Sequence, residues 1–94
     1  MSSQTVQLGT QTITPKVEDS GNTYHIEFQV KITKYLNNST NQTIDVKFTC
    51  NKYKQVPVPS TDPLSPPVFQ TVQKTIKECV DEWYAQHKSV YEVA

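Results

Sequence analysis

A strict alternation of apolar and polar residues between Thr23 and Leu36 constrains the fold of this chain more than any other feature. The apolar side chains occupy even positions: Tyr24, Ile26, Phe28, Val30, Ile32 and Leu36. Only Lys34 interrupts this series. Successive side chains of a strand point to opposite faces, so a period of two over this length predicts one long, half-buried strand. We expect this strand to span residues 22–36.

A second alternating run predicts a neighbouring strand over residues 42–54. Its apolar positions are Ile44, Val46, Phe48 and Cys50. The turn-forming residues 37–41 lie between the two runs, so the pair is expected to form a β-hairpin. We expect Val30 to lie opposite Val46, because this register also places Lys31 opposite Asp45 on the solvent face.

An earlier strand is expected at residues 4–17, joined to the long strand by a turn at residues 18–22, where Gly21 can adopt positive φ. This pairing places Val17 opposite Tyr24 and Ile13 opposite Phe28. Val6 and Leu8 have the wrong parity for the same face, which indicates a β-bulge or a break near Gly9.

Five prolines fall between Pro57 and Pro67, which excludes a helix and the interior of a sheet. We interpret residues 56–65 as an extended connector. The alternative, a proline-rich ligand for an aromatic groove, is less favoured because no basic residue flanks the prolines.

Ser65 as N-cap and Pro66 at the first helical position predict a helix over residues 66–88. Apolar residues follow at spacings of three and four: Phe69, Val72, Ile76, Cys79, Val80, Trp83, His87 and Val90. The expected fold is therefore α+β, a single domain over residues 1–94. It comprises a three-stranded antiparallel meander, in the order 1-2-3, with one long C-terminal helix packed on one face.

Cys50 and Cys79 are the only cysteines in the chain. Their spacing does not match a zinc site. Cys50 belongs to the apolar face of a strand and Cys79 to the apolar stripe of the helix, so the two can meet in a disulfide. Two buried free thiols are the commoner arrangement for such residues, and the sequence leaves both possibilities open.

No pattern in the chain indicates catalysis, and we expect neither a catalytic site nor a cofactor or metal site. His25 points to the opposite face of the sheet from Cys50, and His87 lies two helical turns from Cys79. Glu78, Asp81 and Glu82 lie near lysines on the polar side of the helix, which is typical of a solvated surface.

The charged residues argue against a dedicated nucleic-acid binder. Nine lysines balance nine acidic residues, and arginine, the commonest base-reading side chain, is absent. An alternative function nevertheless remains, in which a lysine- and tyrosine-rich sheet face binds single-stranded nucleic acid. Its contacts would be Lys31, Lys47, Tyr35 and Tyr53.

The sequence contains no apolar run long enough to cross a membrane and no recognisable secretory signal, so we expect no membrane partner and a cytoplasmic location. Three overlapping N-glycosylation patterns, at Asn37, Asn38 and Asn41, fall in the expected hairpin turn. Turn chemistry alone explains asparagine at these positions, and the sequence does not decide whether they are modified.

These observations favour a small, non-catalytic binding or assembly module that acts through protein–protein contacts. A single helix over three strands leaves apolar surface uncovered, so we expect a homodimer, with an unidentified protein as a further partner. Tyr84, Tyr91 and Val93 are the expected interface residues, beside a free edge of the 42–54 strand. Size and composition would suit an accessory protein of a virus or mobile element.

Overall fold

The computed structural model describes residues 4–94 and is mostly β, with 56% of residues in strands and 13% in a helix. The expected α+β fold, a three-stranded meander under a long helix, is therefore wrong. The elements in chain order are β1 (Val6–Leu8), β2 (Gln11–Ile13), β3 (Lys16–Ser20), β4 (Thr23–Tyr35), β5 (Asn38–Asn51), β6 (Tyr53–Pro57), β7 (Phe69–Gln73), α1 (Ile76–His87) and β8 (Tyr91–Val93).

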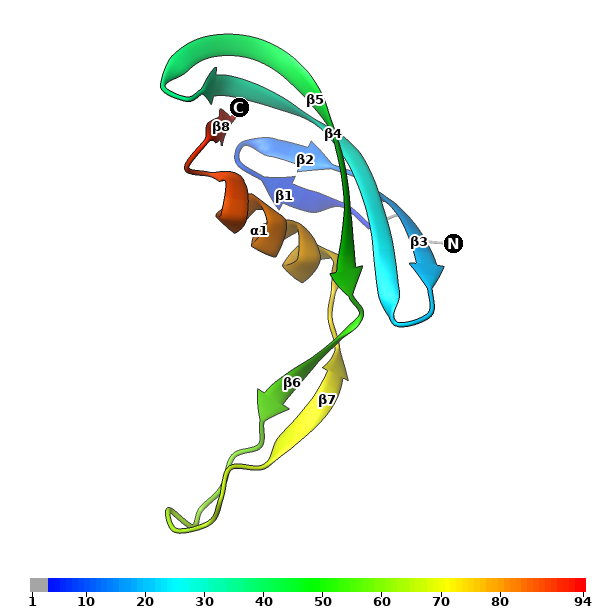
Figure 1. Cartoon of the computed structure of the whole chain (residues 1–94), viewed down its shortest axis with the longest axis vertical. Helices are drawn as coiled ribbons and strands as arrows, with labels where there is room; N and C mark the ends of the chain where they lie inside the picture. The colour runs from blue at the N-terminus through cyan, green and yellow to red at the C-terminus, as the bar shows by residue number, and fades with distance from the viewer. Residues whose placement is uncertain (1–3) are drawn as a thin grey trace.

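The central sheet has four antiparallel strands, with β3, β4 and β5 in that order and β8 paired to β4 on the side away from β5. Figure 1 shows the long β4–β5 hairpin curving over α1 and β8. The apolar side chains of β4 face α1 and the β1–β2 hairpin, and together they form the core. The strand expected at 22–36 is thus confirmed as β4, with the predicted alternation of buried and exposed residues.

The register of β4–β5 pairing differs by two residues from the expected one. Leu36 and Asn37 form a two-residue turn with φ values of 49° and 69°, which matches a type I′ hairpin turn. Val30 therefore lies opposite Ile44 and Lys31 opposite Thr43. The expected pairing of Lys31 with Asp45 is wrong.

The strand expected at residues 4–17 is divided into β1, β2 and β3. Gly9 adopts a φ of +61° and reverses the chain between β1 and β2, so the break near this residue is a hairpin turn. The same turn packs against the C-terminal residues, because the Thr10 amide donates to the Ala94 carbonyl at 3.0 Å. In β3, Val17 lies opposite Ile26 rather than Tyr24, and Ile13 belongs to β2 and does not face Phe28 on a paired strand.

The helix begins at Ile76, ten residues later than expected. Thr75 is its N-cap: the Thr75 hydroxyl accepts a hydrogen bond from the Glu78 amide at 3.1 Å, and the Glu78 carboxylate lies 3.2 Å from the same hydroxyl. This arrangement is a capping box. Ser65, the expected N-cap, instead lies in a loop, and the chain beyond residue 88 forms β8 rather than free helical turns.

Trp83 lies at the centre of the core and is 8% exposed. Its ring packs edge-to-face on Phe28, with centroids 5.4 Å apart, and stacks on Phe48 at 6.1 Å. His87 stacks on the same indole at 4.7 Å. This aromatic cluster joins the helix to both strands of the long hairpin.

Candidate protein-binding arm

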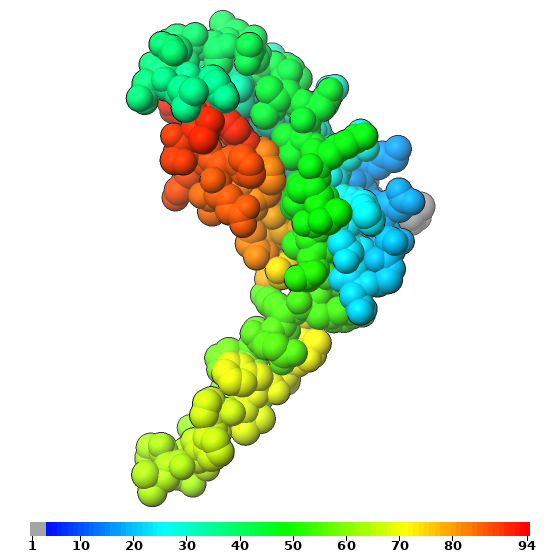
Figure 2. All heavy atoms as spheres, in the orientation of Figure 1, coloured from blue at the N-terminus to red at the C-terminus, as the bar shows by residue number. Residues whose placement is uncertain are grey.

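Residues 53–73 form an arm that stands away from the rest of the molecule. The arm comprises β6, β7 and the loop between them, and Figure 2 shows it as a narrow projection below the body. The molecule measures 53 × 33 × 19 Å along its principal axes, and the arm accounts for its elongated shape. The segment 56–65, expected as an extended connector, therefore forms the end of β6 and most of the loop of a β-hairpin.

The arm is an antiparallel hairpin in which β6 pairs with β7 from Tyr53 opposite Gln73 to Pro57 opposite Phe69. Lys54, Val56, Gln70 and Val72 share one face of the arm, and Tyr53, Gln55, Pro57, Phe69, Thr71 and Gln73 share the other. Pro57 ends β6, where it lies opposite Phe69. The Val58 amide continues the ladder by donating to the Val68 carbonyl at 2.8 Å.

Asp62 organises the loop at the end of the arm. Its carboxylate accepts hydrogen bonds from the Leu64 amide at 3.0 Å and from the Ser65 hydroxyl at 2.9 Å. These two bonds hold the pKa of the Asp62 carboxyl below its usual value. The flanking prolines further restrict the backbone, so the loop presents its side chains from a defined conformation.

The end of the arm is apolar and almost uncharged. Residues 4–94 expose seven large apolar side chains, and five of them belong to the arm: Tyr53, Val58, Leu64, Val68 and Phe69. Leu64 is 91% exposed and Val68 60%. Asp62 is the only charged residue between positions 55 and 73. We call Val58, Leu64, Val68 and Phe69 the apolar tip.

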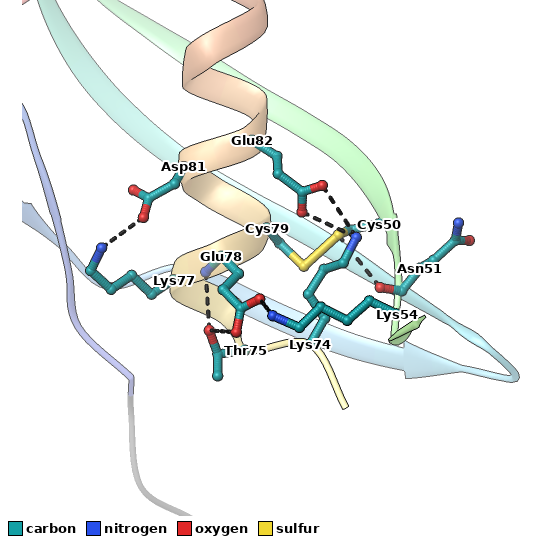
Figure 3. Close-up of polar contacts among 10 residues, drawn as sticks. All are labelled: Cys50, Asn51, Lys54, Lys74, Thr75, Lys77, Glu78, Cys79, Asp81 and Glu82. Atoms are coloured by element: carbon teal, nitrogen blue, oxygen red, sulfur yellow. Dashed lines mark hydrogen bonds and ion pairs between the residues drawn. A yellow bond between two sulfur atoms is a disulfide. The ribbon is translucent and has the colours of Figure 1, made fainter. Parts of the chain in front are cut away.

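The base of the arm is fixed to the body by polar contacts (Figure 3). Lys54 forms an ion pair with Glu78 on α1, and this interaction is the main cause that lowers the pKa of the Glu78 carboxyl. The Gln73 side-chain amide donates to the Tyr24 hydroxyl at 2.6 Å, and the Lys74 amide donates to the Lys52 carbonyl at 2.6 Å. An isolated two-stranded hairpin is marginally stable, so these contacts determine how the arm is held.

Cys50 and Cys79 form a disulfide at the same place, with Cα atoms 6.1 Å apart. It joins the end of β5 to the first turn of α1. Of the two arrangements that the sequence left open, the structure contains the disulfide rather than two free thiols. The bond therefore closes the loop of chain that contains the entire arm.

The three expected interface residues lie elsewhere than the sequence suggested. Tyr91 and Val93 belong to β8 and are buried in the core, and Tyr84 is half-buried against it. The expectation that Tyr91 and Val93 protrude beyond the core is wrong, because the chain turns after α1 and adds β8 to the edge of β4. Tyr91 and Val93 are therefore not exposed for contact with a partner.

Tyr91→Phe tests this burial. The Tyr91 hydroxyl has no hydrogen-bond partner within residues 4–94, and burial raises its pKa to about 12, with a smaller contribution from Tyr84. Because the folded pKa lies above the ordinary value of 10.0, the stability from the neutral hydroxyl is complete below pH 10 and is lost as the pH rises toward 12.

In denaturant titrations between pH 10 and pH 12, the free energy of unfolding should fall more for the wild type than for Tyr91→Phe. At neutral pH the variant should lose no more than about 0.5 kcal/mol, because it removes an unsatisfied polar group. Equal losses in the two proteins above pH 10 would show that Tyr91 is accessible to water.

The four residues of the nucleic-acid alternative do not form one surface. Lys31 and Lys47 lie on the exposed face of the central sheet, where Lys47 is 3.9 Å from Glu27. Tyr35 lies beside the β4–β5 turn, and Tyr53 belongs to the arm. The described residues therefore do not interleave these lysines and tyrosines in a single stacking platform.

The two histidines considered for catalysis lie in different places, and each of the acidic residues Glu78, Asp81 and Glu82 on α1 pairs with a lysine. His25 lies with Lys16, Glu18 and Glu27 in an open groove of about 440 Å³ on the outer face of the sheet. His87 packs between Trp83 and Tyr91, and its Nδ1 atom lies 2.7 Å from the Trp83 carbonyl oxygen. Residues 4–94 contain no cluster of three metal-ligating side chains, and no helix among them is long and apolar enough to span a membrane.

Sequence reasoning missed the apolar tip. The available signal was the composition of residues 55–73, where prolines, valines and one leucine occur with a single charge. A connector is normally polar, so apolar residues among prolines were the feature that distinguished this segment from a plain connector. No protein family model matches the chain, and comparisons with curated proteins and solved structures give no significant match.

Proposed function

We propose that this protein is a non-catalytic protein-binding module and that the arm is its main contact element. The observation that supports this proposal is the concentration of exposed apolar side chains on one projecting, nearly uncharged hairpin. Apolar patches that are exposed to water lower the solubility of a protein, and they commonly mark interaction sites. The partner is a protein that offers an apolar pocket to Leu64, the most exposed side chain of the tip.

The construction of the arm favours binding by a preorganised element. Its prolines and the Asp62 hydrogen bonds restrict the loop before contact, which reduces the entropy lost on association. The Lys54–Glu78 ion pair and the disulfide hold its base against α1. The disulfide also favours an oxidising environment, in place of the cytoplasmic location expected from the sequence.

A photo-cross-linking amino acid at position 64 should capture a discrete partner in the cells that make the protein. The same amino acid at Tyr35, an exposed aromatic position at the end of β4, serves as the control and should capture far less of it. Figure 1 shows the β4–β5 turn at the opposite end of the molecule from the arm. Equal capture from both positions would contradict the assignment to the arm.

The matched variants Leu64→Asn and Leu36→Asn test the affinity for the partner that is captured. Each replaces one exposed leucine, but only the first lies on the arm. Leu64→Asn should weaken binding by about tenfold or more, as expected for a central apolar anchor, and should leave the melting temperature unchanged. Leu36→Asn should bind like the wild type. An unchanged affinity for Leu64→Asn would exclude Leu64 as the anchor.

A further inference from the structure

β5 is an edge strand with one unpaired side. It pairs with β4 from Asn38 to Asn51, and within residues 4–94 no strand pairs with its other side. A free edge of this length is a template for a further strand, and proteins commonly protect such edges with charged residues or proline. β5 contains no proline and only two charged residues, Asp45 and Lys47.

The hydrogen bonds of β4 identify which groups of β5 point outward. The Lys31 amide donates to the Gln11 side chain at 3.2 Å, and the Lys31 carbonyl accepts from the Ala94 amide at 3.0 Å. Both bonds lie on the side of β4 away from β5, where β8 pairs. Because backbone groups alternate along an antiparallel strand, the even-numbered residues of β4 bond to β5.

The register then assigns the backbone groups of β5. Even-numbered residues of β4 face even-numbered residues of β5, as in the pair Val30 and Ile44. The odd-numbered residues Thr43, Asp45, Lys47 and Thr49 therefore direct their N–H and C=O groups to the free side, and all four are exposed. The edge offers a regular ladder of unpaired donors and acceptors at its centre.

This edge is complementary to itself. If a second copy pairs antiparallel about a two-fold axis at Val46, Asp45 of each copy lies opposite Lys47 of the other. Moving the two-fold axis by one residue also keeps the buried faces aligned. An axis at residue 45 places Asp45 opposite Asp45 of the other copy, and an axis at residue 47 places Lys47 opposite Lys47. Like charges directly opposite one another are destabilising, so charge selects the register centred on Val46.

The buried face agrees with the same register. It places Ile44 of one copy beside Phe48 of the other, and both side chains are only partly buried in the single chain. A groove of about 390 Å³ between β5 and α1, with a mainly polar lining that includes Phe48, leaves space on the helix side of the edge. A second strand would therefore cover the parts of Ile44 and Phe48 that one copy leaves open.

We infer that two copies of this chain associate through antiparallel pairing of β5 with β5 about a two-fold axis at Val46. The pairing joins two four-stranded sheets into one continuous sheet and uses the edge strand in place of Tyr91 and Val93. It is independent of the arm, so Leu64→Asn leaves it unchanged. An isologous contact of this kind is the commonest symmetry among small oligomers.

Two charge reversals and their mixture test the register. Asp45→Lys gives like charges at both symmetric contacts, and Lys47→Glu does the same with the opposite sign. Each variant alone should weaken the dimer by about tenfold or more in sedimentation experiments. An equimolar mixture of the two should recover dimers, because every contact in the mixed pair again joins opposite charges.

Glu18→Lys on β3 and Lys31→Glu on β4 are the matched controls, since they make the same changes in charge away from the edge. Both should remain dimeric, and all four variants should melt cooperatively. A wild type with the 10.7 kDa mass of one chain at every concentration would overturn the inference. So would single reversals that stay dimeric, or a mixture that stays monomeric.

Discussion

Trp83→Ala should lower the free energy of unfolding by about 3–5 kcal/mol, a large share of the stability of a domain of this size. The indole packs on Phe28 and Phe48 and is also in contact with His87 and Tyr91, so truncation leaves a cavity where helix and sheet meet. Phe28→Ala should fall in the same range. Chemical denaturation followed by circular dichroism measures both losses.

Phe69→Ala is the control for this experiment. Phe69 is also aromatic, but it is 54% exposed on the arm, so its removal should change the stability by less than about 0.5 kcal/mol. If Trp83→Ala melts within a degree or two of the wild type, the aromatic cluster is not the centre of the core.

Removal of the disulfide should have an effect of similar size. The bond joins residues 29 positions apart, and the loop-entropy model gives about 3–4 kcal/mol for a loop of this length. Cys79 is fully buried, so serine at this position also introduces a buried hydroxyl, and Cys79→Ala is the cleaner replacement. The double variant Cys50→Ala, Cys79→Ala should show the loss in a denaturant titration.

Reduction of the wild type supplies an independent comparison. Wild-type protein in excess reductant should approach the stability of the double variant, and the variant itself should not respond to reductant. An identical denaturation midpoint for oxidised wild type and double variant would show that the bond contributes nothing to folding.

The sequence predicted β4 well because its buried face is nearly uniform. Five apolar side chains from Tyr24 to Ile32 alternate with polar ones, and the structure buries all five. The two-residue error in register leaves the buried face unchanged, because the side-chain period of a strand is two. The register between β4 and β5 depends on where the turn lies. Nothing in the sequence around Leu36 indicated that this residue adopts a positive φ.

The helix was predicted too long because two periodicities overlap. Phe69 and Val72 fit the helical spacing of the residues that follow, yet they belong to β7, which pairs with β6. The capping box of Thr75 and Glu78 marked the true start. The C-terminal residues beyond 88 gave no local signal for β8, because that strand depends on an edge of β4 that only the folded structure provides.

For the candidate site too, features that depend on neighbouring residues were visible in the sequence, and features that depend on distant contacts were not. The prolines excluded helix from residues 56–65, and the apolar composition of the tip was visible in the sequence. Its exposure was not, because a projecting hairpin depends on the pairing of β6 with β7 and on contacts with Glu78 and Tyr24. The free edge of β5 agrees with the edge expected for the 42–54 strand, whereas the interface role of Tyr91 and Val93 did not allow for β8, in which both residues are buried.

The position of the disulfide also determines how the protein responds to a pulling force. Tyr53 begins the arm three residues after Cys50, and Gln73 ends it six residues before Cys79. A load applied by a partner at Leu64 runs along both strands of the arm to its base, where a covalent bond joins β5 to α1. The bond keeps the two ends of the arm together, so the load reaches the body at one point on both elements.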